Sequence, residues 1–491
     1  MGKYILALDQ GTTSSRSLLY DNRGRVVSLD RMEITQVFPK PGWVEQDPYD
    51  ILSTQLLTAK NAFDKVKNPE AVDSIGITNQ RETTLLWERD TGKPLANAIV
   101  WQCRRSSEIC ERLKKQGLSP LVHRKTGLLI DAYFSATKLL WLFEAYPGLL
   151  KRAKNGELLF GTVDTWLLYN LTGTHYTDPT NASRTMLFNI ESLAWDEELL
   201  SLLDIPRSIL PEVRPSGSCF GETKKELFGR SIPVMAVAGD QQAAMFGQGC
   251  FREGAAKNTY GTGCFMLMHT GSRPKYSENG LLTTCLCTTE NHSEYALEGS
   301  VFVGGALVQW LRDRLRVIEE AADTEEVALS VKDNGGVYFV PAFVGLGAPH
   351  WNMECTGTIT GITGGTGREH IVRAALESIA FQCYDLFQCM EKASGIPLEN
   401  LMVDGGASAN DFLMQFQADL LGAALERPAS VETTSQGVCF LAGLGTGTFS
   451  DREELLGMIE TERTFQPQME EQRRADLIEG WRKAVRKTTL E

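Results

Sequence analysis

No apolar run in the sequence approaches the roughly 20 residues that a membrane-spanning helix needs. The N-terminus also lacks a charged-then-apolar signal pattern, because Asp9 interrupts the first apolar run. These two absences predict a cytoplasmic protein without a membrane span. A net charge of −13 leaves no basic excess, which argues against non-specific binding to nucleic acid.

Motifs for zinc and for the commonest nucleotide sites are also missing. The eleven cysteines contain no C-x-x-C pair and the six histidines no H-E-x-x-H motif, so we expect reduced, mostly buried thiols and no zinc site. No strand–helix junction carries G-x-x-x-x-G-K-[ST] or G-x-G-x-x-G, so neither a P-loop nor a Rossmann site is indicated. The chain has 491 residues, which is too long for one hydrophobic core and predicts two large domains.

The segment 4–21, YILALDQGTTSSRSLLYD, has two strand-like apolar runs around a polar turn. Asp9 ends the first run, and the turn supplies Gly11, four hydroxyl groups and Arg16. A hairpin with this turn directs backbone N–H groups and hydroxyls to one side, which suits a phosphate, and its aspartate suits a metal ion. An ordinary edge hairpin would have the same pattern, so both interpretations stay open at this point.

Polar residues follow two further predicted strands. Strand 74–78 is followed by a polar cluster with Arg81 and Glu82, and strand 234–238 by Asp240 at the start of a helix. Open α/β sheets place ligands beyond such strand ends, and an aspartate there is able to accept a proton. The alternatives are a solvated ion pair for Arg81 and Glu82, and N-capping of the helix for Asp240. Farther along, Ser135 is expected to cap a helix that continues to about residue 146.

The hairpin pattern returns in the second half of the chain. Strand-like runs 256–260 and 264–269 flank Gly261-Thr262-Gly263, a second strand, Gly/Thr turn and strand. We infer a duplicated architecture with two related α/β domains that present phosphate-facing hairpins across a cleft. The segment 404–410, DGGASAN, lies between a strand and a helix, where glycines permit close approach of a nucleotide.

Taken together, several of these motifs resemble those of a known group of proteins. DQGTTSSR at 9–16, GTG at 261–263 and DGGASAN at 404–410 resemble the sugar-kinase, heat-shock-protein and actin ATPase superfamily. Within it, YFSATKLLW at 133–141 and GTITGITGGTGREHIVRAALE at 357–377 resemble the two signatures of the FGGY carbohydrate kinases. The resemblance implies an α/β fold with two related ribonuclease H-like (actin-like ATPase) domains facing across a cleft. Residues 1–250 would form the domain that binds glycerol and phosphate, and residues 251–491 the domain that binds the nucleotide.

The resemblance also implies an activity, supported by ITNQRETTLLW at 77–87, WQCRR at 101–105 and GDQQAA at 239–244. The implied reaction is phosphorylation of glycerol by ATP, with Mg²⁺, to give sn-glycerol 3-phosphate and ADP. By similarity, the residues that would hold glycerol are Arg81, Glu82, Tyr133, Asp240 and Gln241, with Trp101 and Phe265 against its carbon edge. Those that would bind ATP are Thr12, Thr13, Ser14, Arg16, Gly261, Thr262, Gly305, Gln309, Gly406 and Asn410. Asp240 would be the general base, and Asp9 and Asp240 would hold the metal.

Two other functions share these features. A regulatory or structural ATPase of the superfamily has no use for an alcohol-binding set, so Arg81, Glu82 and Asp240 argue against it. A kinase of a pentulose or a sugar acid shares the phosphate loops, but the two aromatic residues favour a three-carbon polyol. By similarity we expect a homodimer or homotetramer. The segment 224–231 departs from the loop that binds fructose 1,6-bisphosphate in some bacterial relatives, and 219–233 has no histidine that would be phosphorylated.

Overall fold

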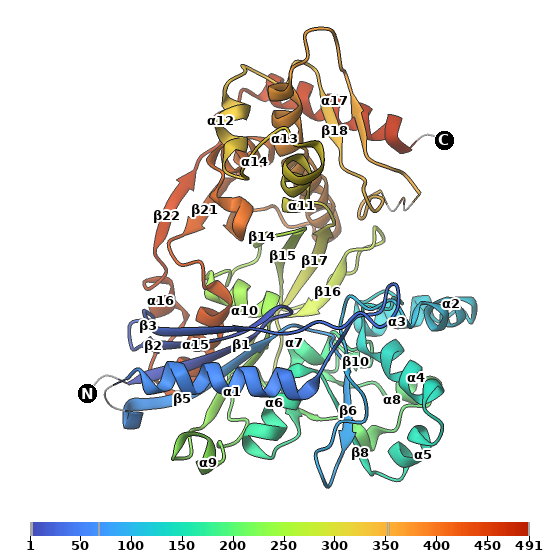
Figure 1. Cartoon of the computed structure of the whole chain (residues 1–491), viewed down its shortest axis with the longest axis vertical. Coiled ribbons are helices and arrows are strands. Elements are labelled where there is room, and N and C mark those ends of the chain that lie inside the picture. The colour runs from blue at the N-terminus through green and yellow to red at the C-terminus, as the bar shows by residue number, and fades with distance from the viewer. Residues whose placement is uncertain (1–2, 67–68, 351, 353, 490–491) are drawn as a thin grey trace.

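Two mixed β-sheets form the centres of two lobes, which lie one above the other in Figure 1. The computed structural model describes residues 3–66, 69–350, 352 and 354–489. The sheet of the lower lobe has the order β13 (Val234–Gly239), β5 (Val72–Asn79), β1 (Tyr4–Gln10), β2 (Ser14–Asp21) and β3 (Val26–Glu33). The sheet of the upper lobe has the order β16 (Leu282–Cys285), β17 (Tyr295–Val301), β15 (Cys264–Gly271), β14 (Ala255–Tyr260), β20 (Asn400–Asp404), β21 (Ala424–Pro428) and β22 (Thr461–Phe465).

Both predicted hairpins are present, and each lies beside a parallel strand. β1 pairs antiparallel with β2 and parallel with β5, while β14 pairs antiparallel with β15 and parallel with β20. This shared arrangement supports the inferred duplication. The first hairpin has longer strands than expected, so Ser14 and Arg16 lie on β2, where Arg16 is directly opposite Asp9. The turn itself is closed by the Gly11 N–H, which donates to the Ser14 carbonyl at 3.0 Å.

Helices cover the lower sheet and form much of its lobe. They are α1 (Pro48–Asp64), α2 (Ser107–Lys115), α3 (Ser119–Thr126), α4 (Ser135–Ala145), α5 (Leu149–Lys154), α6 (Val163–Thr172), α7 (Pro179–Ala182), α8 (Glu197–Leu202), α9 (Lys225–Phe228) and α10 (Asp240–Gly247). Short strands accompany them: β4 (Glu45–Gln46), β6 (Leu85–Glu88), β7 (Ala98–Ile99), β8 (Leu158–Gly161), β9 (Tyr176–Thr177), β10 (Phe188–Asn189), β11 (Ala194–Trp195) and β12 (Glu212–Val213). α1 begins with a proline after Asp47, whose side chain accepts the Tyr49 N–H, and it buries Ile51 and Phe63 on the sheet.

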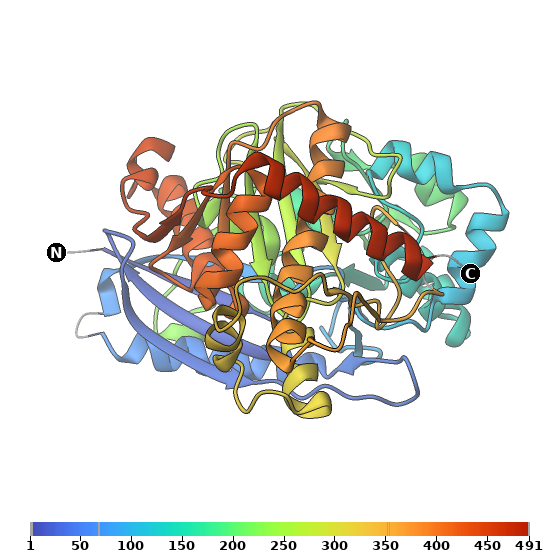
Figure 2. The ribbon, with the colours of Figure 1, turned by 90° about the horizontal axis from the view of Figure 1, so that it is seen from above.

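The upper lobe has its helices around and above its sheet (Figures 1 and 2). They are α11 (Gly305–Trp310), continued by a π-helical turn at 311–315, α12 (Asp323–Leu329), α13 (Arg368–Ser394), α14 (Asp411–Leu421) and α17 (Glu471–Thr489), with β18 (Tyr338–Val340) and β19 (Thr358–Thr360) beside them. In Figure 2 the dark red α17 crosses the top of this lobe. The ring of its Trp481 stacks on Phe381 of α13 with 5.2 Å between centroids, which fixes α17 to the core.

One late helix crosses back to the lower lobe. α15 (Thr433–Thr446), followed by α16 (Arg452–Leu456), packs against α10 and the strands β5, β13 and β1. The contact with β5 is possible because Gly76 has no side chain, since a Cβ atom there would lie 2.5 Å from the Val438 carbonyl oxygen. Ala7, Ala238 and Phe440 belong to the buried cluster that results. The buried core of the lower lobe is therefore built from both ends of the chain.

The outer edge of the upper sheet is fixed to the lower lobe as well. Cys285 of β16 and Tyr295 of β17 belong to the same buried cluster as residues of α3, α4 and α8. The Tyr295 hydroxyl donates to the Ile190 carbonyl at 2.6 Å, and the Thr283 N–H donates to the Gly127 carbonyl at 2.9 Å. β17 therefore passes between the lobes with its base held in place.

The cysteines agree with the expectation of mostly buried free thiols. All eleven are free, nine of them are buried, and Cys219 and Cys355 are the two with greater exposure. Among the described helices, none combines the length and the apolar character that crossing a bilayer would take.

Candidate active site

Arg81 and Glu82 follow β5 after one intervening residue and are almost completely buried, with 3% and 2% of their surface exposed. The interpretation as a solvated ion pair is therefore wrong. Arg81 Nε lies 3.3 Å from Asp240 Oδ1 and 3.8 Å from Glu82 Oε1. Its Nη1 and Nη2 donate to the two oxygens of Glu298 at 2.7 and 2.8 Å, and Nη1 also reaches Gln242 Oε1 at 3.2 Å. The guanidinium thus lies among three carboxylates.

Glu82 adopts an unusual backbone conformation, with φ at 59°. For a residue other than glycine, this conformation costs of order 1 to 3 kcal/mol and is retained where the surroundings enforce it. Arg184 Nε donates to Glu82 Oε1 at 2.5 Å, and the Ser135 hydroxyl donates to the Glu82 carbonyl at 3.1 Å. Phe134 precedes the first residue of α4 and no side chain caps this helix, so the prediction that Ser135 caps it is wrong. The hydroxyl instead stabilises the strained turn at Glu82.

Two aromatic side chains lie beside these charges. Trp101 and Tyr133 pack edge to face with 5.5 Å between their ring centroids. The Trp101 Nε1–H donates to Thr12 Oγ1 at 2.9 Å, which connects the aromatic pair to the turn of the first hairpin. The third predicted aromatic residue, Phe265, is half-buried on β15 opposite Thr259. Trp101 and Tyr133 therefore form one apolar wall, and Phe265 belongs to the other lobe.

Asp240 is the first residue of α10, and the residue before it, Gly239, occupies the N-cap position. Its side chain is 33% exposed, in contrast to the buried Arg81. Burial raises the pKa of Asp240 above its ordinary value, Arg81 and Lys257 counteract this increase, and the charge of Asp9 adds to it. A carboxylate with this elevated pKa is better suited to accept a proton near neutral pH than an ordinary aspartate.

Asp9 is the penultimate residue of β1 and is buried, with 2% of its surface exposed. It pairs with Arg16 across the hairpin, and Arg16 Nη1 also lies 2.9 Å from Glu432 Oε2, at the start of α15. Burial raises the pKa of Asp9, and Arg16 opposes that effect. The charge of Asp9 contributes to the raised pKa of Asp240, so the two carboxylates are near enough to influence each other. Carboxylate oxygens are ligands that suit a divalent cation such as Mg²⁺. Within the described ranges, no group of three or more His, Cys, Asp or Glu residues could by itself hold a metal ion.

The second hairpin turn is held by the start of α11. The Gly305 N–H donates to the Gly261 carbonyl at 2.8 Å, and the Gly304 and Ala306 N–H groups donate to the Thr262 carbonyl at 2.9 and 3.0 Å. A Cβ atom at Gly305 would lie 2.7 Å from the Gly261 oxygen, so this close packing requires glycine. Thr262 itself is exposed at the tip. Thr12 and Thr13 occupy the corresponding turn of the lower lobe, partly and largely exposed respectively.

The other predicted ATP residues lie on the upper lobe. A Cβ atom at Gly406 would meet no atom within 4 Å, so open space adjoins this backbone. Asn410 caps α14, because its Oδ1 accepts the Leu413 N–H at 2.9 Å, and its Nδ2 donates to Thr324 at 3.2 Å. Gln309 is exposed on α11. In the described part of the chain, neither of these two side chains forms a hydrogen bond to the second hairpin turn.

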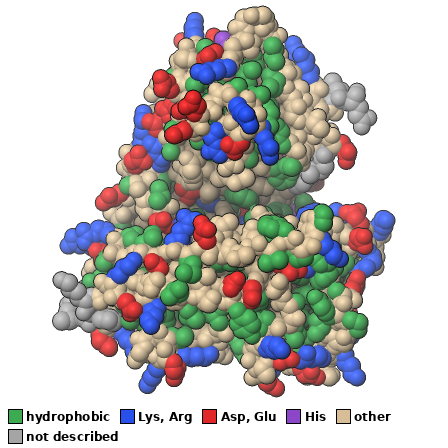
Figure 3. Space-filling view, viewed as in Figure 1, with side chains coloured by type: hydrophobic (Ala, Val, Ile, Leu, Met, Phe, Trp, Pro, Cys, Tyr) green, Lys and Arg blue, Asp and Glu red, His purple; other side chains and the backbone are tan. Residues whose placement is uncertain are grey.

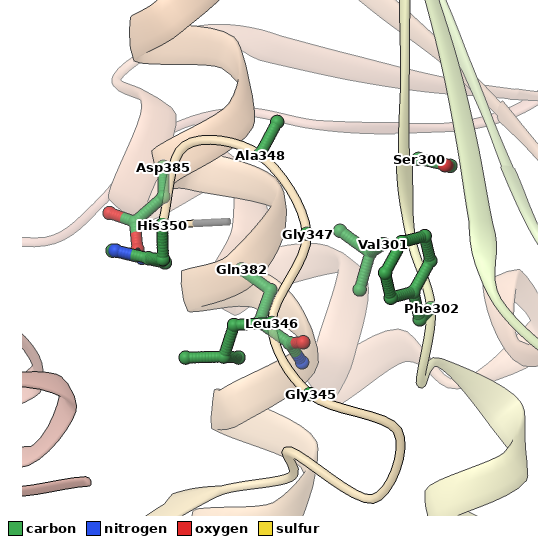
Figure 4. Close-up of a pocket in the computed structure, with 10 residues that line it drawn as sticks. All are labelled: Ser300, Val301, Phe302, Gly345, Leu346, Gly347, Ala348, His350, Gln382 and Asp385. Atoms are coloured by element: carbon green, nitrogen blue, oxygen red, sulfur yellow. The ribbon is translucent and has the colours of Figure 1, made fainter. Parts of the chain in front are cut away.

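Figure 3 shows the molecule hollowed between the two lobes. Contacts of buried cations also join the two lobes: Arg81 donates to Glu298, and Lys257 of β14 donates through its Nζ to Gln241 Oε1 at 2.6 Å. A separate small pocket in the upper lobe lies between the end of β17, the loop 345–350 and α13 (Figure 4). There His350 Nε2 lies 3.2 Å from Asp385 Oδ2, and none of the predicted site residues lines this pocket.

Comparison with known proteins agrees with this architecture. Residues 4–247 match the N-terminal domain of the FGGY family of carbohydrate kinases, and residues 256–446 match its C-terminal domain. The chain belongs to the FGGY family of carbohydrate kinases. Over 486 residues, 98% of each chain, it is 55% identical to glycerol kinase 2 of Thermotoga maritima. Over 487 residues, 98% of this chain and 97% of the relative, it is 56% identical to the glycerol kinase of Carboxydothermus hydrogenoformans.

Solved structures of the FGGY family have the same fold. A crystal structure of Plasmodium falciparum glycerol kinase with ADP superposes with a TM-score of 0.96 at 37% identity, covering 100% of this chain and 99% of that one. The xylulose kinase of Lactobacillus acidophilus superposes with a TM-score of 0.90 at 23% identity, covering 99% and 97%. The second likeness concerns the fold alone.

Three charged residues of this FGGY-family site were missed by the sequence analysis: Arg184, Lys257 and Glu298. Lys257 and Glu298 are single charged residues within buried strands, AAKNTY and YALEGSV. A lone charge in an apolar strand indicates a buried ion pair or a functional residue, so this pattern could have identified them. Arg184 follows α7 in a polar segment that has no such contrast. Burial alone would raise the pKa of Glu298, but Arg184 and Arg81 lower it to about 2.

Proposed function

We propose that this protein transfers the γ-phosphoryl group of ATP to glycerol, giving sn-glycerol 3-phosphate and ADP. The observation that carries the proposal is the arrangement of Arg81, Glu82 and Asp240 beside the Trp101–Tyr133 wall. The relatives that match this chain over 97% or more of their length are named glycerol kinases, which supports the same acceptor.

The proposed acceptor site suits a small polyol. Glycerol has three hydroxyl groups and little apolar surface, so directed hydrogen bonds must supply its affinity and specificity. An analogue without one hydroxyl would leave a buried charged group unpaired, which is costly. In this proposal the hydroxyls bind to Arg81, Glu82, Tyr133, Asp240 and Gln241, and the carbon edge lies against Trp101 and Phe265.

Asp240 is the proposed general base. It accepts the proton of the attacking hydroxyl while the new O–P bond forms and the bond from the γ-phosphorus to the ADP oxygen breaks. Its raised pKa suits this role, and nearby Arg81 and Lys257 favour the ionised form at neutral pH. Mg²⁺ held by Asp9 and Asp240 would neutralise charge on the transferred phosphoryl group. Arg81 and Glu82 orient the acceptor oxygen.

The nucleotide is proposed to lie between the two hairpins. Residues 251–491 would supply most of its site and residues 1–250 the phosphate contacts and the acceptor site. The proposed ATP contacts are Thr12, Thr13, Ser14 and Arg16 from the lower lobe, and Gly261, Thr262, Gly305, Gln309, Gly406 and Asn410 from the upper lobe. Closure of the lobes would exclude water, which otherwise competes as the phosphoryl acceptor. A homodimer or homotetramer in the cytoplasm stays a prediction.

A coupled assay of ADP release tests the proposal. The purified protein is given ATP and Mg²⁺ with glycerol, dihydroxyacetone, xylulose or gluconate, and without an acceptor. We expect the largest kcat/KM with glycerol and little ADP release without an acceptor. Equal ADP release with and without glycerol would indicate an ATPase without a small-molecule acceptor. A preference for xylulose or gluconate would refute the assignment of the three-carbon polyol.

A further inference from the structure

We infer that Glu298, on β17 of the upper lobe, is a positioning residue that fixes the guanidinium of Arg81 toward the acceptor. This inference rests on the proposed function, because it assigns Arg81 to the glycerol site. Glu298 is 4% exposed and accepts hydrogen bonds from both terminal nitrogens of Arg81, at 2.7 and 2.8 Å. The pair joins two sheets and spans 217 positions of the sequence.

The two hydrogen bonds determine which side of the guanidinium faces the acceptor. With Nη1 and Nη2 held by Glu298, the Nε edge of Arg81 faces Asp240 at 3.3 Å and Glu82 at 3.8 Å. A paired, planar geometry of this kind restricts rotation of the guanidinium. Without Glu298, Arg81 would lose its two closest acceptors and would turn toward Asp240 and Glu82, which are the groups proposed to hold the alcohol.

Glu298 also contacts a second buried guanidinium. Arg184 Nη2 lies 3.1 Å from Glu298 Oε1, while Arg184 Nε donates to Glu82 Oε1 at 2.5 Å. Arg184 is completely buried, so a ligand in the recess does not reach it. One carboxylate from the upper lobe therefore holds both cations that surround Glu82.

The position of Glu298 is itself fixed. Tyr295, three residues earlier on β17, is anchored in the lower lobe through its hydroxyl. Gln242 Nε2 of the lower lobe donates to Thr284 Oγ1 on the adjacent strand β16 at 2.8 Å. Thr284 is opposite Ala296 of β17, so both contacts hold the first part of this strand against the lower lobe, two to three residues before Glu298. Glu298 is therefore able to serve as a rigid acceptor for Arg81.

The test compares Glu298→Gln and Glu298→Asp with a matched control, Glu294→Gln. Glu294 immediately precedes β17 and pairs with Arg452 at 2.8 Å, away from Arg81. We expect Glu298→Gln to raise the KM for glycerol at least tenfold, because removing one partner leaves buried cations unpaired. The KM of Glu298→Gln for ATP should stay within twofold of the wild type. Glu298→Asp should recover part of the glycerol affinity, and Glu294→Gln should have the same KM values as the wild type.

Circular dichroism and thermal melting establish that each variant is folded. A folded Glu298→Gln protein whose KM for glycerol stays within twofold of the wild type would overturn the inference, and so would equal increases in both KM values. If Glu298→Gln does not fold, Glu298→Asp decides in the same way, with an unchanged KM for glycerol counting against the inference. A wild-type protein that is inactive on glycerol would instead refute the proposed function and this assignment with it.

Discussion

Replacing Asp240 by asparagine removes a charge and a proton acceptor but keeps the size of the side chain. The surrounding network retains most of its bonds. Arg81 keeps both hydrogen bonds to Glu298, and Lys257 keeps Gln241 and Thr259 as acceptors at 2.6 and 2.8 Å. The substitution therefore isolates the chemical role of the carboxylate from its structural role.

The expected magnitudes of the two roles differ. The ion contact of Asp240 with Arg81 is 33% exposed on the aspartate side, so its loss should cost about 0.2 to 1 kcal/mol. If this loss were coupled in full to glycerol binding, it would change the KM for glycerol by at most about fivefold. Loss of a positioned general base typically lowers kcat by about 10²- to 10⁴-fold, or about 2.7 to 5.5 kcal/mol in the barrier. The decrease should therefore be almost entirely in kcat.

Steady-state ADP release and single-turnover measurements at pH 7.5 separate the two effects. Asp164→Asn is a matched control, because Asp164 is a buried carboxylate held by Thr162 and Thr177 hydroxyls at 2.5 and 2.6 Å, outside the acceptor network. It should keep kcat within threefold. A folded Asp240→Asn enzyme with a kcat within fivefold of the wild type would refute the assignment of the base. A fall in kcat/KM caused by KM alone would give Asp240 a binding role only.

Three further predictions concern other parts of the molecule. Trp101→Phe removes the hydrogen bond to Thr12 but keeps an aromatic ring. We expect a threefold to tenfold loss of kcat/KM for glycerol and an unchanged melting temperature. An unaltered kcat/KM would count against a role for this bond. Gly405→Ala should lower the melting temperature, because φ is 88° and a Cβ atom would lie 2.6 Å from a carbonyl oxygen of β14. Gly406→Ala should leave the melting temperature unchanged and raise the KM for ATP. Similar melting temperatures for both variants would contradict this difference. Burial raises the pKa of Asp164 to about 7, so the folded state binds a proton more tightly than the unfolded state. The free energy of unfolding should therefore decrease as the pH rises from about 4 to 7. Chemical denaturation of Asp164→Asn should show a smaller decrease over this range, and equal slopes of unfolding free energy against pH would contradict the prediction.

Local sequence patterns were sufficient to predict the strand ends that carry the site. Asp9, Arg81 and Asp240 were all predicted from an apolar run followed by polar residues, and each lies within two residues of the end of β1, β5 or β13. The second hairpin was predicted in the same way from Gly261 and Thr262. Such features depend on residues near one another in the chain, and alternation of apolar and polar residues records them.

The contacts that surround Arg81 and Glu82 were not predictable from local pattern. Arg184 is 102 positions from Glu82, and Glu298 is 217 positions from Arg81. The sequence around Ser135 predicts a helix cap, but its hydroxyl bonds to the Glu82 carbonyl instead. Long-range partners of this kind depend on how the two lobes fold against each other, and a single sequence contains no direct record of that packing.

The start of α15 explains why two distant aspartates have fixed positions relative to each other. Glu432, just before this helix, holds Arg16 and through it Asp9 of the lower sheet. The adjacent Thr433 hydroxyl donates to Asp404 Oδ2, at the end of β20 in the upper sheet, at 2.6 Å. Because α15 itself packs on the lower sheet, these two neighbouring residues connect the ends of central strands from both lobes. Together with the contacts of β16 and β17 with the lower lobe, this connection fixes the end of β1 relative to the end of β20.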